Sequence, residues 1–180
     1  MKDYNKICEN IINLGADKAV CIDVDQIVFN TDFRKSCEEN RCGHYNKNYT
    51  CPPYAGTPQQ LIEKVKGYAK AVVIVCTEKI DGYQDTYGIK KAENRIADTA
   101  LLADEYAIKE GFDHMVIGGS SCKKCNPCGM AEGKPCPLPE KAFISLSAYC
   151  VDIAQLSKSC GIEMVWDGSE VSYFAMMLIK

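Results

Sequence analysis

The sequence predicts one α/β domain over residues 1–180, with a mostly parallel sheet flanked by helices and two long cysteine-rich loops at one edge of that sheet. Strand-like and helix-like segments alternate along the chain, as they do where crossovers join parallel strands. Residues 69–76 are apolar and β-branched without alternation, which is typical of a strand covered on both faces. The length of 180 residues and the apolar content of 47% fit a single globular core.

The first half of the chain predicts two helices and one strand region. Residues 3–14 carry apolar side chains at helical spacing and are followed by a glycine, which predicts a helix. Residues 18–24, with a further apolar group at 27–29, predict a strand or a bent strand pair. A capping box with proline at the first helical position opens a helix over residues 57–68.

The second half of the chain predicts the remaining elements. Residues 69–76 are expected to form the central strand, and residues 88–110 a long helix that lies on the sheet. The other expected elements are a strand at 114–118, helical structure over 139–160, and strands at 162–165 and 171–179.

Charge and hydropathy argue against two classes of partner. The chain has 21 Lys and Arg against 24 Asp and Glu, so its formal charge of −3 provides no basic field for nucleic acid or for an anionic membrane surface. The longest apolar run, residues 71–76, is too short to cross a bilayer, and the first residues do not resemble a signal peptide. We therefore expect a cytoplasmic protein.

Cysteine is the outlier of the composition, with 12 residues in a chain expected to work in a reducing compartment. Disulfides are rare in such compartments, so metal binding or redox chemistry is the better explanation. Seven of the 12 fall in two stretches: Cys37, Cys42 and Cys51, and then Cys122, Cys125, Cys128 and Cys136. Because the carboxyl ends of parallel strands share one edge, we expect both stretches, and Cys76 from the central strand, to meet there.

The second stretch has the spacing of an iron–sulfur site. The first three cysteines form C-x2-C-x2-C, the triplet of bacterial ferredoxins, and a Cys-Pro pair follows after seven intervening residues. Cys136 can then fold back as the fourth ligand of the same cluster. A [4Fe–4S] cluster on Cys122, Cys125, Cys128 and Cys136 is the preferred interpretation. Structural zinc bound by the same four thiolates is the main alternative, ahead of a redox dithiol or unbound cysteines.

The first stretch supplies only three thiolates to a metal. The candidates for a fourth ligand are His44, Cys76, or no protein group at all. An open position separates catalytic metal sites from structural ones, so the third case would admit a small molecule. Free or merely reactive cysteines are the alternative for this stretch.

The remaining cysteines are expected to be structural, since Cys8, Cys21, Cys150 and Cys160 lie among apolar residues where a thiol packs as a small hydrophobe. The chain has no P-loop, dinucleotide-binding or zinc-protease motif.

These blocks resemble a family of predicted metal-binding proteins known as domain of unknown function 2284. The resemblance covers most of the chain and rests on these matches: Cys37, Cys42 and Cys51-Pro-Pro-Tyr54; Thr57-Pro58; Gly118-Gly119-x-x-Cys122-x-x-Cys125-x-x-Cys128; and Gly133-Lys-Pro-Cys136-x-x-Pro139. Such proteins are frequent in anaerobes, which implies iron–sulfur chemistry at the matching cysteines. The family has a glycine before an isoleucine–aspartate pair where this chain has Cys150-Val151-Asp152.

Three functions remain open on this basis. The first is an iron–sulfur protein that passes electrons to a redox partner protein. The second is an enzyme whose three-cysteine site presents an open metal to a small-molecule substrate and receives electrons from the other cluster. The third is a zinc-stabilised interaction module without catalysis.

Overall fold

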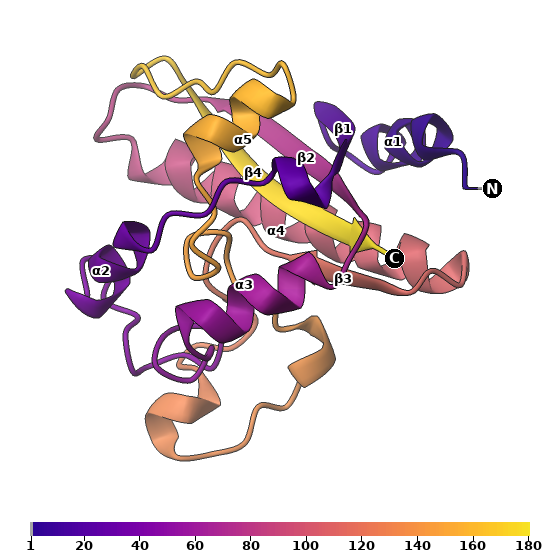
Figure 1. The fold of residues 1–180 in the computed structure, drawn as a ribbon. Coiled ribbons are helices and arrows are strands. Elements are labelled where there is room, and N and C mark those ends of the chain that lie inside the picture. The colour runs from indigo at the N-terminus through magenta and orange to yellow at the C-terminus, as the bar shows by residue number, and fades with distance from the viewer. Residues whose placement is uncertain (1) are drawn as a thin grey trace.

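The computed structural model describes residues 2–180 and shows four strands in one sheet with helices on both faces (Figure 1). The strands are β1 (Lys18–Asp23), β2 (Lys70–Lys79), β3 (His114–Ile117) and β4 (Glu170–Ile179), and they lie in the order β1-β2-β4-β3. Every neighbouring pair is antiparallel. The prediction of a mostly parallel sheet is therefore wrong.

The apolar pattern of β2 indicates that the strand is buried on both faces. It does not indicate whether the adjacent strands run parallel or antiparallel to it. Val73 and Val75 face one core, whereas Ile74 and Cys76 face the other. β2, helix α4 (Thr86–Lys109) and β3 do form a crossover between strands of the same direction. β4, from the far end of the chain, inserts between them and pairs antiparallel with both. No local pattern in the sequence predicts that β4 lies between β2 and β3.

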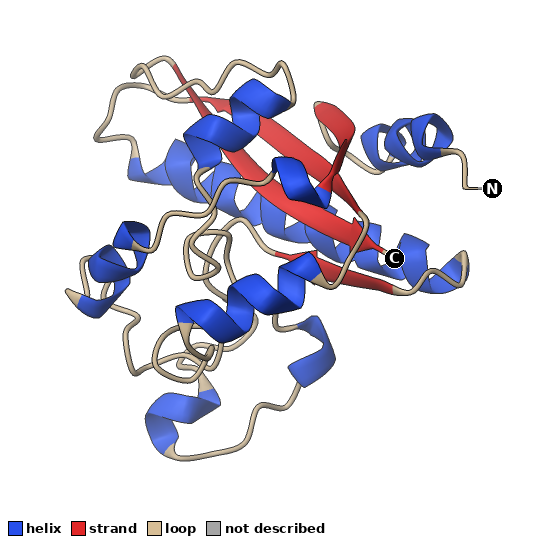
Figure 2. Ribbon diagram, in the orientation of Figure 1, coloured by secondary structure: helices blue, strands red, loops and turns tan. Residues whose placement is uncertain are grey.

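Helices cover both faces of the sheet, as the sequence predicted (Figure 2). On one face, α1 (Tyr4–Asn13) and α4 pack side chains such as Ile11 and Ile96 against the sheet. On the other face, α3 (Pro58–Lys66) and α5 (Ile153–Ser159) contribute Val65 and Leu156 to a second core. The sheet is therefore the middle layer of three.

The helices expected at 3–14, 57–68 and 88–110 correspond to α1, α3 and α4. The capping box of α3 is formed: the Gln60 N–H donates to Thr57 Oγ1 at 3.3 Å, and the Thr57 N–H donates to Gln60 Oε1 at 2.9 Å. These local signals are strong because each one satisfies backbone groups that a helix end leaves open.

Other local expectations are wrong. The helical structure expected over 139–160 consists of the 3₁₀ turn η3 (Pro139–Lys141), irregular chain and the short α5. No strand forms at 162–165, and the group at 27–29 contributes only a bridge between Phe29 and Val151. The sequence reading missed α2 (Asp32–Glu38); short 3₁₀ turns η1 (Val24–Gln26) and η2 (Gly129–Glu132) complete the described elements. No helix among residues 2–180 has the length and apolar character that crossing a membrane would require.

Candidate metal centre

Hydrogen bonds join the two cysteine segments, residues 30–56 and 119–142. The Cys122 N–H donates to Thr50 Oγ1 at 3.0 Å, and the Thr50 hydroxyl donates to Asn48 Oδ1 at 2.9 Å. Asn48 Nδ2 then donates to the Cys122 carbonyl at 2.7 Å, which closes a ring of three residues. Asn48 and Thr50 are both buried. The structure therefore brings the two segments together.

The route by which they meet differs from the expected one. In the register of the sheet, Asp23 at the end of β1 pairs with Lys70 at the start of β2, so β1 ends at the opposite end of the sheet from β2 and β3. The chain then runs back along the sheet, where the Asn30 N–H donates to the Cys150 carbonyl at 2.7 Å. The two cysteine segments therefore come together because the chain after β1 runs back along the sheet. They do not meet because their strands end at the same edge.

The second segment leaves β3 through two glycines. A side chain at Gly119 would place its Cβ 2.7 Å from the Phe174 carbonyl and 2.9 Å from Ile96, so only glycine fits between β4 and α4. Beyond it, Lys123 forms an ion pair with Glu93 of α4, and Lys124 lies 3.8 Å from Asp98 of the same helix. The segment is thus held against α4 at the point where its first cysteine occurs.

The four cysteines of the second segment line one small cavity. Its volume is about 10 Å³, close to that of one water molecule, and its walls include Cys122, Cys125, Cys128 and Cys136. Burial raises the pKa of Cys122; a hydrogen bond from the Lys124 N–H lowers it, and the nearby thiols of Cys136, Cys125 and Cys128 add to the rise. η2 turns the chain back after the triplet, and the Lys134 N–H donates to the Gly129 carbonyl at 2.8 Å. The loop therefore places Cys136 beside the triplet despite its distance in sequence.

The three cysteines of the first segment line a separate and larger cleft, which we call the cysteine chamber. It has a volume of about 480 Å³ and is lined by Cys37, Cys42, His44, Cys51, Ser120 and Lys123, among others. Burial and the nearby Cys42 raise the pKa of Cys51 to about 11, with smaller contributions from Cys37 and Cys128. Thr50, which accepts from the Cys122 N–H, directly precedes Cys51, so the two cysteine groups are close neighbours.

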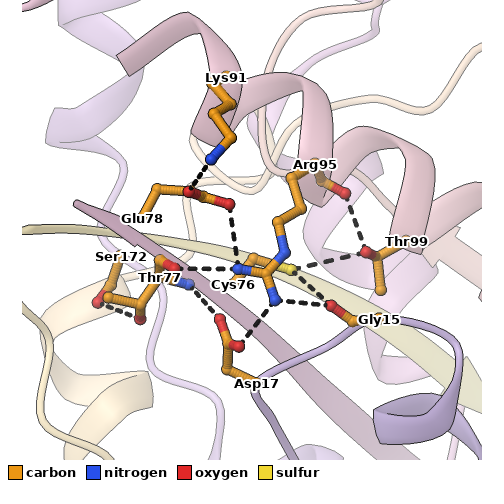
Figure 3. A network of polar contacts seen from close by, with 9 residues as sticks. All are labelled: Gly15, Asp17, Cys76, Thr77, Glu78, Lys91, Arg95, Thr99 and Ser172. Carbon is orange, nitrogen blue, oxygen red and sulfur yellow. Dashed lines mark hydrogen bonds and ion pairs between the residues drawn. The ribbon is translucent and has the colours of Figure 1, made fainter. Parts of the chain in front are cut away.

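The two protein candidates for a fourth ligand lie in different places. His44 lines the cysteine chamber. The Cys76 thiol instead donates to Thr99 Oγ1 at 3.6 Å and to the Gly15 carbonyl at 3.8 Å, on the face of the sheet that α4 covers (Figure 3). Cys76 is fully buried there and does not line either cysteine cavity.

The gathered thiols do not form a preformed coordination shell. Within residues 2–180, no three Cys, His, Asp or Glu side chains are arranged so that they could hold one ion. Burial raises the pKa of Cys37, Cys51 and Cys122, so these groups are neutral thiols at neutral pH. A metal would bind them as thiolates and release their protons.

Arg34 is a feature of the site that sequence reasoning missed. The residue is only 5% exposed, and its guanidinium donates to the carbonyls of Ala148 at 3.1 Å and Gly56 at 2.6 Å. Its Nε has no hydrogen-bond partner among residues 2–180, and the Glu38 carboxylate is 3.8 Å away. Burial raises the pKa of Cys37, while the positive charge of Arg34 acts in the opposite direction. The sequence did not indicate that Arg34 lies near Cys37, because the helix that carries both residues, α2, was not predicted.

An antiparallel sheet between two helical layers, with two cysteine segments packed together, defines a cysteine-rich three-layer protein of helices and antiparallel strands. The chain belongs to the family of predicted metal-binding proteins DUF2284, whose model matches residues 20–179. The resemblance drawn from the sequence is thereby confirmed, and the matched range contains all seven cysteines of the two segments. No curated protein and no solved structure matches the chain.

Proposed function

We propose that the protein is a redox metalloprotein that holds a [4Fe–4S] cluster on Cys122, Cys125, Cys128 and Cys136. The observation that carries this proposal is the single cavity that all four thiols line. A donor set made only of cysteine sulfur suits iron–sulfur clusters and zinc, and it does not suit hard cations such as magnesium or calcium. When bound, such a cluster supplies one-electron chemistry.

The residues around the cavity fit this assignment. Thr50 and Asn48 hold both backbone polar groups of Cys122, so the first ligand is oriented by a buried polar shell. Hydrogen bonds to the ligating residues orient the ligands of a metal centre and adjust its reduction potential. Electrons would pass to a redox partner protein or to a small molecule bound nearby.

The three-cysteine site is the proposed place for that small molecule. Cys37, Cys42 and Cys51 would hold a metal that keeps one position open, with His44 as the alternative fourth ligand. The cysteine chamber beside them, at about 480 Å³, lies in the size range of small-molecule sites. Thr50, next to Cys51 in the chain, is hydrogen-bonded to the Cys122 N–H at 3.0 Å, so the two centres would lie close together, as electron exchange between them requires.

A second candidate function is a zinc-stabilised interaction module without catalysis. The observation that favours it is the volume of the second cavity, because about 10 Å³ accommodates a single ion more easily than a cluster. Four cysteine thiolates around one zinc are a common structural site.

Metal analysis of oxygen-protected protein separates these proposals. The protein should be purified without oxygen and assayed for iron, acid-labile sulfide and zinc. About four irons and four sulfides per chain support one cluster, and about eight irons support loading of both segments. One zinc and no sulfide would support the interaction module instead.

A pair of variants assigns the cluster to its ligands. Cys125→Ser should lose most of the iron and sulfide, because it removes one of the four thiolates. Cys160→Ser is the matched control: this cysteine packs against the core on the α5 side, and its replacement should leave the iron content unchanged. Full iron content in Cys125→Ser would contradict the assignment.

A further inference from the structure

The cysteine chamber continues into a second cavity. This second cavity, the aromatic chamber, has a volume of about 420 Å³ and is lined by Phe33, Ile153, Met164, Trp166, Tyr173 and Phe174, among others. The two chambers share four lining residues: Phe33, Gly119, Ser147 and Tyr173. They therefore form one elongated cleft with two chemically different ends, each of ligand size.

Exposed apolar side chains gather at the aromatic chamber. Trp166 is 50% exposed, Met164 44% and Phe33 38%, which are high values for side chains of this size. The Trp166 and Tyr173 rings meet edge to face, with centroids 6.3 Å apart and planes at 62°. Exposed apolar side chains that cluster around a cavity often mark a binding site, whereas single scattered ones do not. Aromatic rings also favour further rings in edge or offset contact.

Trp166 is presented by an ordered turn. The Ser172 N–H donates to the Val165 carbonyl at 2.9 Å, which ties the irregular segment before Trp166 to the start of β4. Asp167 Oδ1 accepts hydrogen bonds from the N–H groups of Ser169 at 2.8 Å and Glu170 at 3.1 Å. These hydrogen bonds fix the turn, and the turn holds the Trp166 indole in its exposed position.

The charges along the cleft orient a ligand. The cysteine chamber is lined by Arg41, Lys123, Glu93 and several serine hydroxyls. Lys123 pairs with Glu93, and Arg41 pairs with Glu39 at 2.7 Å, so the charges at this end are balanced and hydroxyl donors remain available. The aromatic chamber has a carboxylate, Asp152, whose Oδ1 accepts from the Gln155 N–H at 3.0 Å and which would repel an anion. Of the two ends, the cysteine end is therefore the better place for an anionic group, because it has hydroxyl and cationic donors, whereas Asp152 would repel an anion at the aromatic end.

We propose that this cleft binds a small aromatic carboxylate, with its ring in the aromatic chamber and its carboxylate in the cysteine chamber. The inference rests on the proposed function in one respect, since the carboxylate would lie beside the proposed open metal position. The binding itself relies on the described side chains and does not need the metal. It therefore names the substrate class for the three-cysteine site.

The single tryptophan of the chain reports binding directly. Trp166 is the only tryptophan among the 180 residues, so its fluorescence can be followed while benzoate is added to the full-length protein. Benzoate should change the emission in a saturable way. Cyclohexanecarboxylate, which has the charge without the aromatic ring, and benzylamine, which has the ring with the opposite charge, should each bind about tenfold more weakly. Equal binding of all three compounds, or no saturable response to benzoate, would overturn the proposal.

A matched pair of variants locates the ring. Met164→Gln replaces an apolar wall of the aromatic chamber with a polar group of similar size and should weaken benzoate binding about fivefold to tenfold. Ile108→Gln is the control, because this side chain is 64% exposed on α4 and does not line the cleft. An unchanged affinity in Met164→Gln, or an equal loss in both variants, would place the ring elsewhere and overturn the proposal.

Metal content measured on the same samples keeps the two proposals distinct. Titrations should be made on protein as purified without oxygen and after removal of metal by chelation. Saturable benzoate binding in both samples supports the cleft. A protein that contains no iron but binds benzoate would overturn the proposed function and leave the cleft standing. An iron-loaded protein that fails to bind benzoate would overturn the cleft proposal and leave the proposed function standing.

Discussion

The side chain of Asn48 donates a hydrogen bond to the backbone carbonyl of Cys122 at 2.7 Å, although the two residues are 74 positions apart in the chain. Thr50 completes the link by accepting from the Cys122 N–H and donating to Asn48 Oδ1. One cysteine segment therefore fixes the backbone of the first cysteine of the other. Because Asn48 and Thr50 are both buried, water cannot easily replace either partner.

Thr50→Val should destabilise the protein by about 1–3 kcal/mol, since the isosteric valine leaves the Cys122 N–H without its acceptor and removes one of the two hydrogen bonds that Asn48 Oδ1 accepts from Thr50. Urea unfolding of the metal-free, reduced protein measures this change. Thr50→Ser keeps the hydroxyl and should recover most of the loss, and Thr86→Val, at an exposed threonine, should change little. If Thr50→Val unfolds at the wild-type urea concentration, the ring contributes no stability.

Arg34→Met should cost about 2–4 kcal/mol, because the carbonyls of Ala148 and Gly56 lose a charged donor in a buried place. The pKa of Cys37, which burial raises and Arg34 lowers, should rise further, so alkylation of this thiol by iodoacetamide at a fixed pH should slow. Mass spectrometry of the labelled peptide follows the rate. Arg41→Met, at an exposed arginine, is the control, and an equal effect of both substitutions on Cys37 would exclude a specific role for Arg34.

The sequence was informative where a signal is local and misleading where topology decides. The capping box of α3 and the burial pattern of β2 could be read directly, because each depends on near neighbours or on the faces of one strand. The insertion of β4 between β2 and β3 depends on residues at the far end of the chain, so no pattern in those strands predicted it. The cysteine spacing divides the seven thiols into two sets, and each set lines its own cavity; whether either set binds a metal stays a prediction. The contacts of Asn48 and Arg34 were not predictable, since each links residues that only the fold brings near.

Asp17 should make the stability of the protein dependent on acidic pH. Partial burial would raise the pKa of this carboxyl, but hydrogen bonds from Arg95 at 2.7 Å and from the Thr77 N–H at 2.7 Å outweigh burial and hold the pKa below its ordinary value of 3.8 (Figure 3). A carboxyl with a lowered pKa in the folded state stabilises the fold above its unfolded pKa. That contribution is lost as the pH falls through the folded pKa.

Asp17→Asn should therefore unfold at a lower urea concentration than the wild type at pH 7, and the difference should shrink as the pH falls below about 4. Unfolding curves at a series of pH values, on metal-free and reduced protein, test this. Asp25→Asn, at an exposed aspartate, should show no such trend. A difference between Asp17→Asn and wild type that stays constant down to pH 2.5 or so would mean that the ionised carboxylate is not what stabilises the fold.

Cys150 occupies a position that suits glycine. Its φ is 61°, in the left-handed region, and two hydrogen bonds close the turn around it: the Cys150 N–H donates to the Ser147 carbonyl at 3.0 Å and the Val151 N–H to the Leu146 carbonyl at 3.1 Å. This is the Schellman arrangement, in which the left-handed residue is usually glycine. A side chain here costs about 1–2 kcal/mol of backbone strain.

Cys150→Gly should therefore be more stable than Cys150→Ala by about 1 kcal/mol, although both lose the same buried thiol. At an ordinary backbone position the order is reversed, because glycine loses more conformational entropy on folding. Ala148→Gly, two residues earlier and outside the left-handed region, should accordingly be destabilised relative to wild type. Urea unfolding of the three metal-free variants measures the order. A Cys150→Ala protein as stable as Cys150→Gly would show that the turn carries no strain at this residue.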